Sequence, residues 1–170
     1  MKTNSVQFFN GTKIKPVCSN CELILAAWEL RNPSNMGHII RLGNNSGAKK
    51  VLFAGDYKNY RKSKIKKTAG FSFEQLEWQI IAPEKFSTEI EKNMELVILE
   101  TCENSTSIFE TKLPQKAIIL AGNEAHGLPK EVINSSKTKV HIPMPGECKS
   151  MNISHALAVA ALEWYRQHSR

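Results

Sequence analysis

The 170-residue chain lacks the patterns that identify several common enzyme classes. No GxGxxG follows its first apolar run, which excludes the dinucleotide-binding fingerprint. No GxxxxGK[ST] occurs, so a phosphate-binding P-loop is not expected. A GxSxG hydrolase elbow is also missing. The five histidines show no HExxH spacing, and the single CxxC has no second pair to complete a zinc ribbon. We therefore expect no metal site.

Long apolar runs are also missing. None approaches the roughly 20 residues that a membrane-spanning helix needs. The first five residues, Met-Lys-Thr-Asn-Ser, do not begin a signal peptide with an apolar core. We expect a cytoplasmic protein with no membrane partner. The length suits one domain with a proper hydrophobic core.

Cysteine is scarce, with four in the chain. Cys18 and Cys21 form the CxxC, while Cys102 and Cys148 are isolated. A redox CxxC usually opens a helix after a strand, whereas this one precedes the first apolar run. We interpret Cys18 and Cys21 as two reduced thiols without an assigned role.

Positive charge is in excess, with a net charge of +7 and a pI of about 9.3. This balance favours polyanionic partners, with nucleic acid first. The charge is densest in residues 57–67, which hold six lysines and arginines and two interleaved tyrosines. One interpretation is a solvated helix face. The other is a phosphate-binding patch whose tyrosines are available for stacking.

Apolar runs alternate with helix-like segments along the whole chain. The predicted strands are 23–28, 51–54, 78–81, 96–99, 116–121 and 138–142. The predicted helices are 36–46, 57–67, 83–93, 129–133 and 151–168. This alternation predicts an α/β fold with a mostly parallel six-stranded sheet and helices on both faces. We expect residues 1–21 to be an N-terminal extension and residues 22–170 to form the domain.

Three polar loops stand out, at residues 35–41, 122–127 and 142–154. Taken singly, each has an ordinary explanation: Arg41 could be a solvated side chain, and Ser150 or Asn152 could cap the last helix. Gly122 directly follows a predicted strand, where a glycine lets backbone approach a ligand closely. Together the loops suggest a ligand site where strand ends feed loops.

The three loops resemble the motifs of one family, the SpoU/TrmH group of SPOUT-superfamily RNA 2′-O-ribose methyltransferases. The resemblance covers residues 23–165. The first motif, N-x-G-x-I-x-R, stands here as Asn35, Gly37, Ile39 and Arg41. The second, G-N-E-x-x-G-L, stands as Gly122, Asn123, Glu124, Gly127 and Leu128. The third, I-P-M followed by S-[LM]-N-[LIV]-S, stands as Ile142, Pro143, Met144, Ser150, Met151, Asn152, Ile153 and Ser154.

The resemblance implies a deep trefoil knot within about residues 118–170, a homodimer, and S-adenosylmethionine as the methyl donor. Such knots are rare exceptions to unthreaded connections, and nothing in the periodicity predicts one. In the family the knot loops hold the donor mainly through backbone groups. Carried over by motif, the donor-binding residues are Leu99, Gly122, Asn123, Ile142, Met144, Ser150 and Met151.

The resemblance also implies catalytic roles, with Arg41 at the centre. Proton abstraction by Arg41 itself is demanding, because an arginine holds its proton with a pKa above ~12. Arg41 could instead anchor the neighbouring phosphate and stabilise the developing alkoxide. Asn35 and Glu124 would position Arg41 or the knot loops, while Ser150 and Asn152 would shape the donor pocket and acceptor geometry. Whether Arg41 serves its own chain's donor or its dimer partner's is left open.

The acceptor implied is a ribose 2′-OH of RNA, with Arg41, Arg61, Lys62 and Lys64 as RNA contacts. A nearly bare catalytic domain looks more like the tRNA-modifying members, so tRNA is favoured over rRNA. Two alternatives remain: an rRNA 2′-O-methyltransferase, and a non-catalytic RNA-binding or assembly protein that keeps the knot fold. A flavodoxin-like nucleotide protein is a more distant one.

Overall fold

Seven strands form one sheet in the computed structural model, which describes residues 4–58, 60–90, 92–123 and 125–170. In chain order they are β1 (Glu22–Trp28), β2 (Lys50–Ala54), β3 (Glu77–Ile81), β4 (Glu95–Leu99), β5 (Thr106–Ser107), β6 (Lys116–Ala121) and β7 (Thr138–His141). The order across the sheet is β3-β2-β1-β6-β4-β7-β5, with parallel pairing throughout. The predicted parallel α/β fold is confirmed. The strand count of six was one short, because Thr106 and Ser107 also pair with β7.

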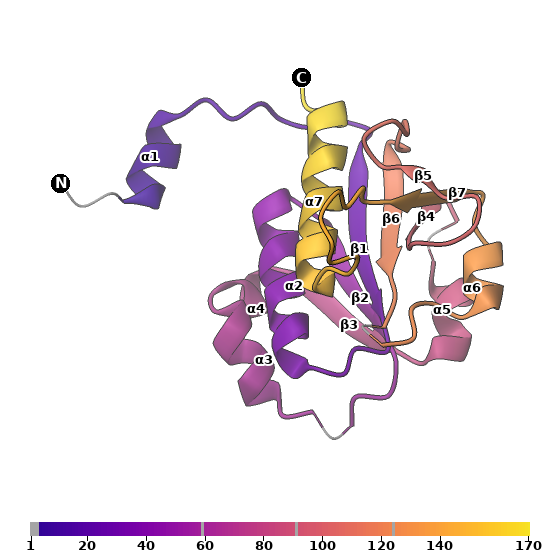
Figure 1. Cartoon of the computed structure of the whole chain (residues 1–170). Coiled ribbons are helices and arrows are strands. Elements are labelled where there is room, and N and C mark those ends of the chain that lie inside the picture. The colour runs from indigo at the N-terminus through magenta and orange to yellow at the C-terminus, as the bar shows by residue number, and fades with distance from the viewer. Residues whose placement is uncertain (1–3, 59, 91, 124) are drawn as a thin grey trace.

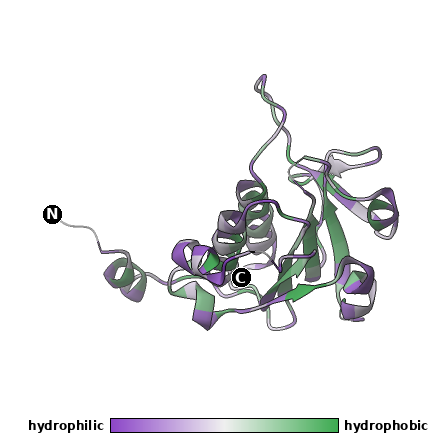
Figure 2. Ribbon diagram, turned by 90° about the horizontal axis from the view of Figure 1, so that it is seen from below, coloured by the Kyte–Doolittle hydropathy of each residue, from purple (hydrophilic) through white to green (hydrophobic). Residues whose placement is uncertain are grey.

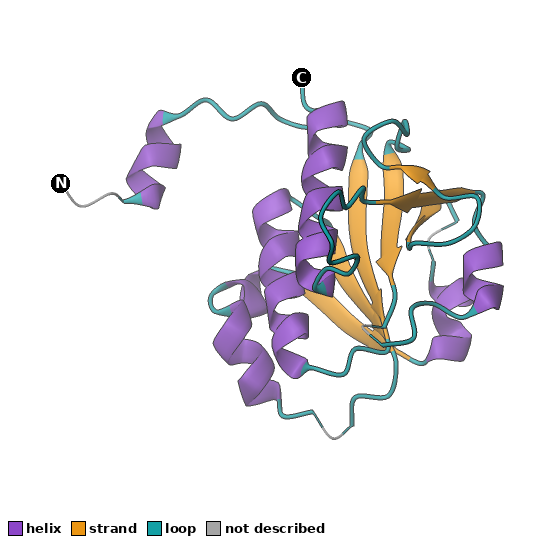
Figure 3. Cartoon of the chain, in the orientation of Figure 1, coloured by secondary structure: helices purple, strands orange, loops and turns teal. Residues whose placement is uncertain are grey.

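Helices cover both faces of the sheet (Figures 1 and 3). In chain order the helices are α1 (Ser5–Gly11), which stands apart from the sheet, α2 (Pro33–Ser46), α3 (Lys62–Ala69), α4 (Ser72–Gln75), the 3₁₀ turn η1 (Pro83–Lys85), α5 (Phe86–Glu89), α6 (Lys130–Asn134) and α7 (Ile153–His168). On one face lie α2, α3, α4 and α7; on the other lie α5 and α6. Two predicted helices are shorter than expected: 57–67 becomes helical only at Lys62, and 83–93 ends at Glu89. Helix α3 ends at Ala69, and α4 begins three residues later at Ser72.

The central strands β2, β1, β6 and β4 are buried between two apolar layers, which explains why they appear in the sequence as continuous apolar runs. Side chains of β1 alternate between the layers, with Leu23 and Leu25 in one and Ile24 and Ala26 in the other. Figure 2 shows this apolar centre between helices with polar outer faces. Five residues of α7 at the spacing of a core-facing helix are all buried: Ile153, Leu157, Ala160, Ala161 and Trp164.

The N-terminal segment leaves the domain beside the C-terminal end of α7 (Figure 1). Its short helix α1 exposes Phe8 and Phe9. Among the described residues, no helix is long and apolar enough to span a membrane. Cys18 and Cys21 form a disulfide, so their interpretation as reduced thiols was wrong. A tight turn, in which Cys21 N donates to Cys18 O over 2.9 Å, brings the two residues together. A domain boundary after residue 21 stays a prediction.

Gly37 allows α3 to pack directly against α2. A Cβ atom at this position would lie only 2.5 Å from the backbone oxygen of Ile65 and would overlap the hydroxyl of Thr68. Ile65 and Thr68 both belong to α3. The glycine of the first motif is therefore required by helix packing, and it holds the lysine-rich helix beside α2.

Replacing Gly37 with alanine should reduce the free energy of unfolding by about 1–3 kcal/mol, the usual range for overpacking. The loss is expected even though alanine favours a helix interior over glycine by up to about 1 kcal/mol. Urea denaturation measures it. Gly11→Ala is the matched control, because a Cβ at Gly11 would meet no atom within 4 Å. A Gly37→Ala protein as stable as the wild type would contradict the packing argument.

Candidate functional site

Four strands end in a single row at one edge of the sheet. The parallel register places Ala121 of β6 opposite both Ala27 of β1 and Leu99 of β4, and it places Leu99 opposite Val140 of β7. From β1 the chain moves outward to β2 and β3, whereas β6 and β4 lie on its other side. Such a switch in strand order leaves a crevice beyond the carboxyl ends of the strands, where α/β proteins bind ligands.

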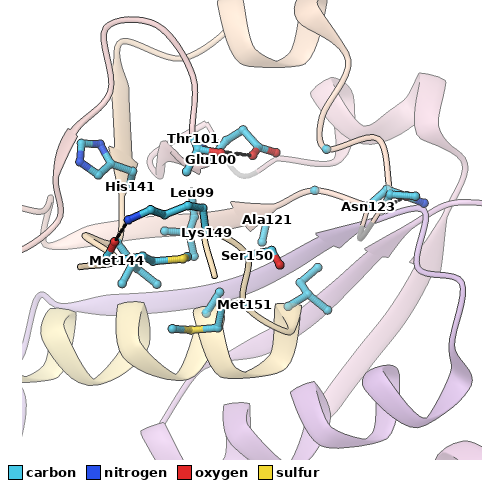
Figure 4. A pocket seen from close by; sticks show the side chains of 16 residues that line it. Leu99, Glu100, Thr101, Ala121, Asn123, His141, Met144, Lys149, Ser150 and Met151 are labelled. Atoms are coloured by element: carbon cyan, nitrogen blue, oxygen red, sulfur yellow. Dashed lines mark hydrogen bonds between the residues drawn. The ribbon is translucent and has the colours of Figure 1, made fainter. Parts of the chain in front are cut away.

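A pocket of about 210 Å³ occupies this crevice (Figure 4). Its walls come from the loops after β4, β6 and β7 and from the start of α7. We name it the strand-end pocket. It brings together all seven residues predicted to bind the donor: Leu99, Gly122, Asn123, Ile142, Met144, Ser150 and Met151. Their binding of a donor stays a prediction, but the loops converge on one small volume.

Two glycines shape the loop that follows β6. A Cβ on Gly122 would lie 2.5 Å from the backbone carbon of Gly127 and 2.6 Å from the backbone nitrogen of Leu128. Gly127 has a φ of 65°, in the left-handed region that favours glycine. A Cβ on Gly127 would also meet the Glu100 carboxylate at 2.6 Å. The loop thus folds back on itself with no room for side chains at either position.

Asn123 holds the same loop in place. Its Oδ1 accepts from the backbone N–H groups of Ala125 (2.7 Å) and His126 (3.1 Å). Its Nδ2 donates to the backbone oxygen of Glu29, just after β1, over 2.5 Å. One side chain therefore ties the loop after β6 to the loop after β1. In this structure Asn123 holds two loops of the pocket together, a role that the motif alone did not indicate.

The strand-end pocket is also lined by two charged side chains that the sequence analysis did not single out. Glu100 directly follows β4, and its Oε1 accepts from the backbone N–H of Thr101 over 3.0 Å. Lys149 donates from Nζ to the backbone oxygen of Met144 over 2.8 Å and so closes the 144–149 loop (Figure 4). The available signal was their position, one directly after a strand and the other directly before Ser150.

A second concave region lies between α2 and the start of α7, with a volume of about 470 Å³. We name it the helix hollow. It contains Asn35, Arg41 and Asn152, three of the five predicted catalytic residues. Ser150 lines the strand-end pocket instead, and Glu124 lies outside the described residues. Arg41 is exposed, and within the described part of the chain it has no ion pair.

Asn152 joins the two concave regions. Its Oδ1 accepts from the backbone N–H of Ser154 over 2.9 Å and from the Ser154 hydroxyl over 2.7 Å, which caps α7. This fixes the orientation of the amide, so that Nδ2 points to Asn35 and donates to its Oδ1 over 3.2 Å. Asn35 is buried, with 5% of its surface exposed. Asn152 therefore caps the last helix, as the sequence suggested, and also links α2 to the strand-end pocket.

The basic side chains and the tyrosines of the lysine-rich segment 57–67 have different surroundings. Arg61, Lys62 and Lys64 are exposed at the start of α3, as an RNA contact requires. The tyrosines are structural: the Tyr57 hydroxyl accepts from Leu30 N (2.9 Å) and donates to Ala54 O (3.1 Å). The Tyr60 hydroxyl donates to the Leu30 oxygen over 2.7 Å. The interpretation of these tyrosines as stacking platforms is not supported, because their hydroxyls fix the loop after β1.

The free thiols do not supply a nucleophile to the strand-end pocket. Burial raises the pKa of the Cys102 thiol, and the nearby Glu100 carboxylate adds to this shift, which keeps Cys102 protonated. Hydrogen bonding with Ser150 lowers the pKa of the exposed Cys148 thiol. Neither cysteine is among the described residues that line the strand-end pocket. Across residues 4–170, apart from 59, 91 and 124, no group of three or more His, Cys, Asp or Glu could hold a metal ion.

Comparison with known proteins identifies relatives over nearly the whole domain. The profile of the SpoU rRNA Methylase family matches residues 22–162. A 23S rRNA (guanosine-2′-O-)-methyltransferase of Xylella fastidiosa is 27% identical over 86% of this chain and 59% of its own length. The tRNA (cytidine(34)-2′-O)-methyltransferase of Escherichia coli is 26% identical over 85% of this chain and 93% of its own length.

Solved structures agree. A crystal structure described as an RNA 2′-O ribose methyltransferase superposes with a TM-score of 0.78 and 27% identity, over 92% of this chain and 60% of that one. The chain spans about half to three fifths of the length of the first relatives it matches.

Gly122→Ala should abolish ligand binding in the strand-end pocket, because the added methyl group would collide with backbone that cannot rotate away. The probe is S-adenosylmethionine, the donor implied by the sequence motifs. A ligand that binds only the folded protein raises its melting temperature, so the wild type should show a thermal shift and the variant none. Gly146→Ala, in an open part of the 144–149 loop, is the control and should keep the shift. Normal binding by Gly122→Ala would contradict the assignment.

Proposed function

Because the chain belongs to the SpoU rRNA methylase family, we propose that it transfers a methyl group from S-adenosylmethionine to a ribose 2′-OH of RNA. The observation that carries the proposal is the hydrogen bond between Asn35 and Asn152. It fastens the helix hollow, which contains Arg41, to the segment that leaves the strand-end pocket at Ser150 and Met151. A donor site beside an acceptor site is the arrangement that group transfer between two bound molecules needs.

The lining of the strand-end pocket fits the proposed donor. Leu99, Ile142 and Met144 offer apolar surface for a flat base. Gly122 lines the pocket, and its lack of a Cβ lets the loop after β6 fold back on itself at the pocket wall. The Glu100 carboxylate supplies negative charge at the wall of the pocket. When bound, S-adenosylmethionine supplies an electrophilic methyl group on a positively charged sulfur.

The protein's own contribution is alignment and charge management. The hydrogen bond from Lys149 to Met144 and the Asn152 cap hold the third-motif loop, while Asn123 holds the loop after β6. Arg41, exposed in the helix hollow, would bind the phosphate next to the target ribose and stabilise the alkoxide that develops on its 2′-oxygen.

For the RNA substrate we propose tRNA, with rRNA as the alternative. The Escherichia coli relative named as acting on cytidine 34 of tRNA is matched over 93% of its length, whereas the Xylella rRNA relative is matched over 59%. Mass spectrometry of tRNA and rRNA digests from a strain without this protein tests the choice. We expect one 2′-O-methyl mark to disappear from tRNA, and a loss confined to rRNA would contradict it.

We also propose that the protein is a homodimer, as the motif resemblance implies. Leu162 on α7 is 58% exposed, which leaves apolar surface on the helix that borders the hollow. Light scattering on purified protein measures the mass. Mixing Arg41→Ala with Gly122→Ala chains then separates two arrangements, because activity returns in the mixture only if Arg41 serves the partner's donor.

Arg41→Ala should lower the rate of methyl transfer by at least about 100-fold, the lower end for removing one hydrogen-bond donor that stabilises a developing oxyanion. Binding of S-adenosylmethionine should be unchanged, because Arg41 lines the helix hollow and not the strand-end pocket. Transfer from labelled donor measures the rate, and calorimetry measures donor binding. Asn45→Ala, in the same hollow, is the control. Retained transfer by Arg41→Ala would remove it from the mechanism.

Replacing Arg61, Lys62 and Lys64 together with alanine should weaken RNA binding and flatten its salt dependence. Removing one phosphate contact lowers the slope of log K against log salt by about 0.7–0.9, so the slope should fall by up to about 2–3. Filter binding across a salt series measures it. The control triple Lys85, Lys130 and Lys137 removes the same charge from exposed positions near α5 and α6. Equal losses in the two triples would exclude α3 as a specific RNA surface.

A further inference from the structure

The proposed reaction needs a group that takes a proton, and Arg41 is poorly suited to this. A ribose hydroxyl is a weak nucleophile until its proton is removed. A guanidinium carries five donors and no acceptor, and it keeps its charge in proteins. A group other than Arg41 must therefore accept the proton, and the side chains of the helix hollow are the candidates that the structure offers. This inference rests on the proposed function.

Two imidazoles share the helix hollow with Arg41. His38 comes from α2 and His155 from the first turn of α7, and both are exposed. The remaining described lining consists of asparagine, serine, leucine and alanine. Imidazole is the ordinary side chain that gains and loses a proton near neutral pH. These two histidines are thus the only described groups of the hollow with the chemistry of a general base.

His38 lies on the same stripe of α2 as the two motif residues. It follows Asn35 by three residues and precedes Arg41 by three, so all three project to one side of the helix. With a rise of about 1.5 Å per residue, His38 is roughly 4.5 Å along the axis from Asn35, half the distance of Arg41. Since Asn35 is bonded to Asn152, His38 is nearer to the strand-end pocket than Arg41 along this helix.

We propose that His38 is the general base of the reaction. Its neutral imidazole takes the proton of the ribose 2′-OH as the oxygen's electron pair forms the new O–C bond to the methyl group. The C–S bond breaks at the same time, and its electron pair leaves the sulfur as a neutral thioether. The proton on the imidazole then passes to solvent. Arg41 keeps its proton throughout and stabilises the charge on the oxygen.

The surroundings of His38 fit this role. The charged or titratable groups that line the hollow beside it are Arg41 on α2 and His155 on α7. The opposite side of α2 packs against uncharged parts of α3, at Thr68 and the backbone of Ile65. No carboxylate is among the described residues of the hollow. The sequence motif passed over His38 because its position is a variable one in N-x-G-x-I-x-R.

The test uses His38→Ala, with His155→Ala as the matched control from the same hollow. Single-turnover methyl transfer is measured with saturating S-adenosylmethionine and tRNA from about pH 5.5 to 8.5. The wild-type rate should rise with pH and level off. His38→Ala should lose about 10²–10⁴-fold, the usual contribution of a general base, and its rate should keep rising without a plateau. Free imidazole should restore part of the loss, and binding of the donor should be unchanged.

His155→Ala should keep the plateau of the wild-type pH profile and should not respond to free imidazole. The inference is overturned if His38→Ala keeps the wild-type profile, if imidazole gives no rescue, or if His155→Ala shows the loss instead. A wild-type protein that transfers no methyl group at any pH, to tRNA or rRNA, would overturn the proposed function itself. That result is distinct from an active wild type with an unaffected His38 variant.

Discussion

Ala27, Leu99, Ala121 and Val140 stand in one row because β1, β6, β4 and β7 run parallel in a fixed register. Each strand therefore delivers its following loop to the same edge of the sheet. Slipping any one strand by a residue would turn its side chains to the opposite layer and disrupt the close packing of both layers. The strand-end pocket depends on that register, because its walls come from three of these loops.

The hydrogen bond between Asn35 and Asn152 extends the site from the sheet edge to the helices. It spans 117 residues of sequence and is partly sheltered from water, where leaving one polar group without its partner costs free energy. On one side of it lie Ser150 and Met151 in the strand-end pocket; on the other lie His38 and Arg41 in the helix hollow. Both interpretations of Asn152, as a helix cap and as a site residue, agree with this geometry.

The sequence predicted what depends on local apolar periodicity and on motif spacing. Six strands, the last helix and the convergence of seven pocket residues follow from those patterns. What it missed depends on distant partners. Strand β5 has only two residues and exists through pairing with β7. Tyr57 and Tyr60 suggested stacking platforms until Leu30, 27 and 30 residues away, accounted for their hydroxyls. The sequence did not indicate a role for His38, because its place in the helix hollow depends on the contact of α7 with α2 through Asn152 and Asn35. The trefoil knot stays a prediction.

The central claim is that the ribose oxygen, and no base atom, receives a methyl group from S-adenosylmethionine. The most direct measurement incubates the purified protein with donor carrying a deuterated methyl group and with tRNA, then digests the RNA to nucleosides for mass spectrometry. The account predicts a deuterated methyl group that stays with the ribose fragment when the glycosidic bond breaks. A label on the base fragment, or no labelled nucleoside from tRNA or rRNA, would contradict it.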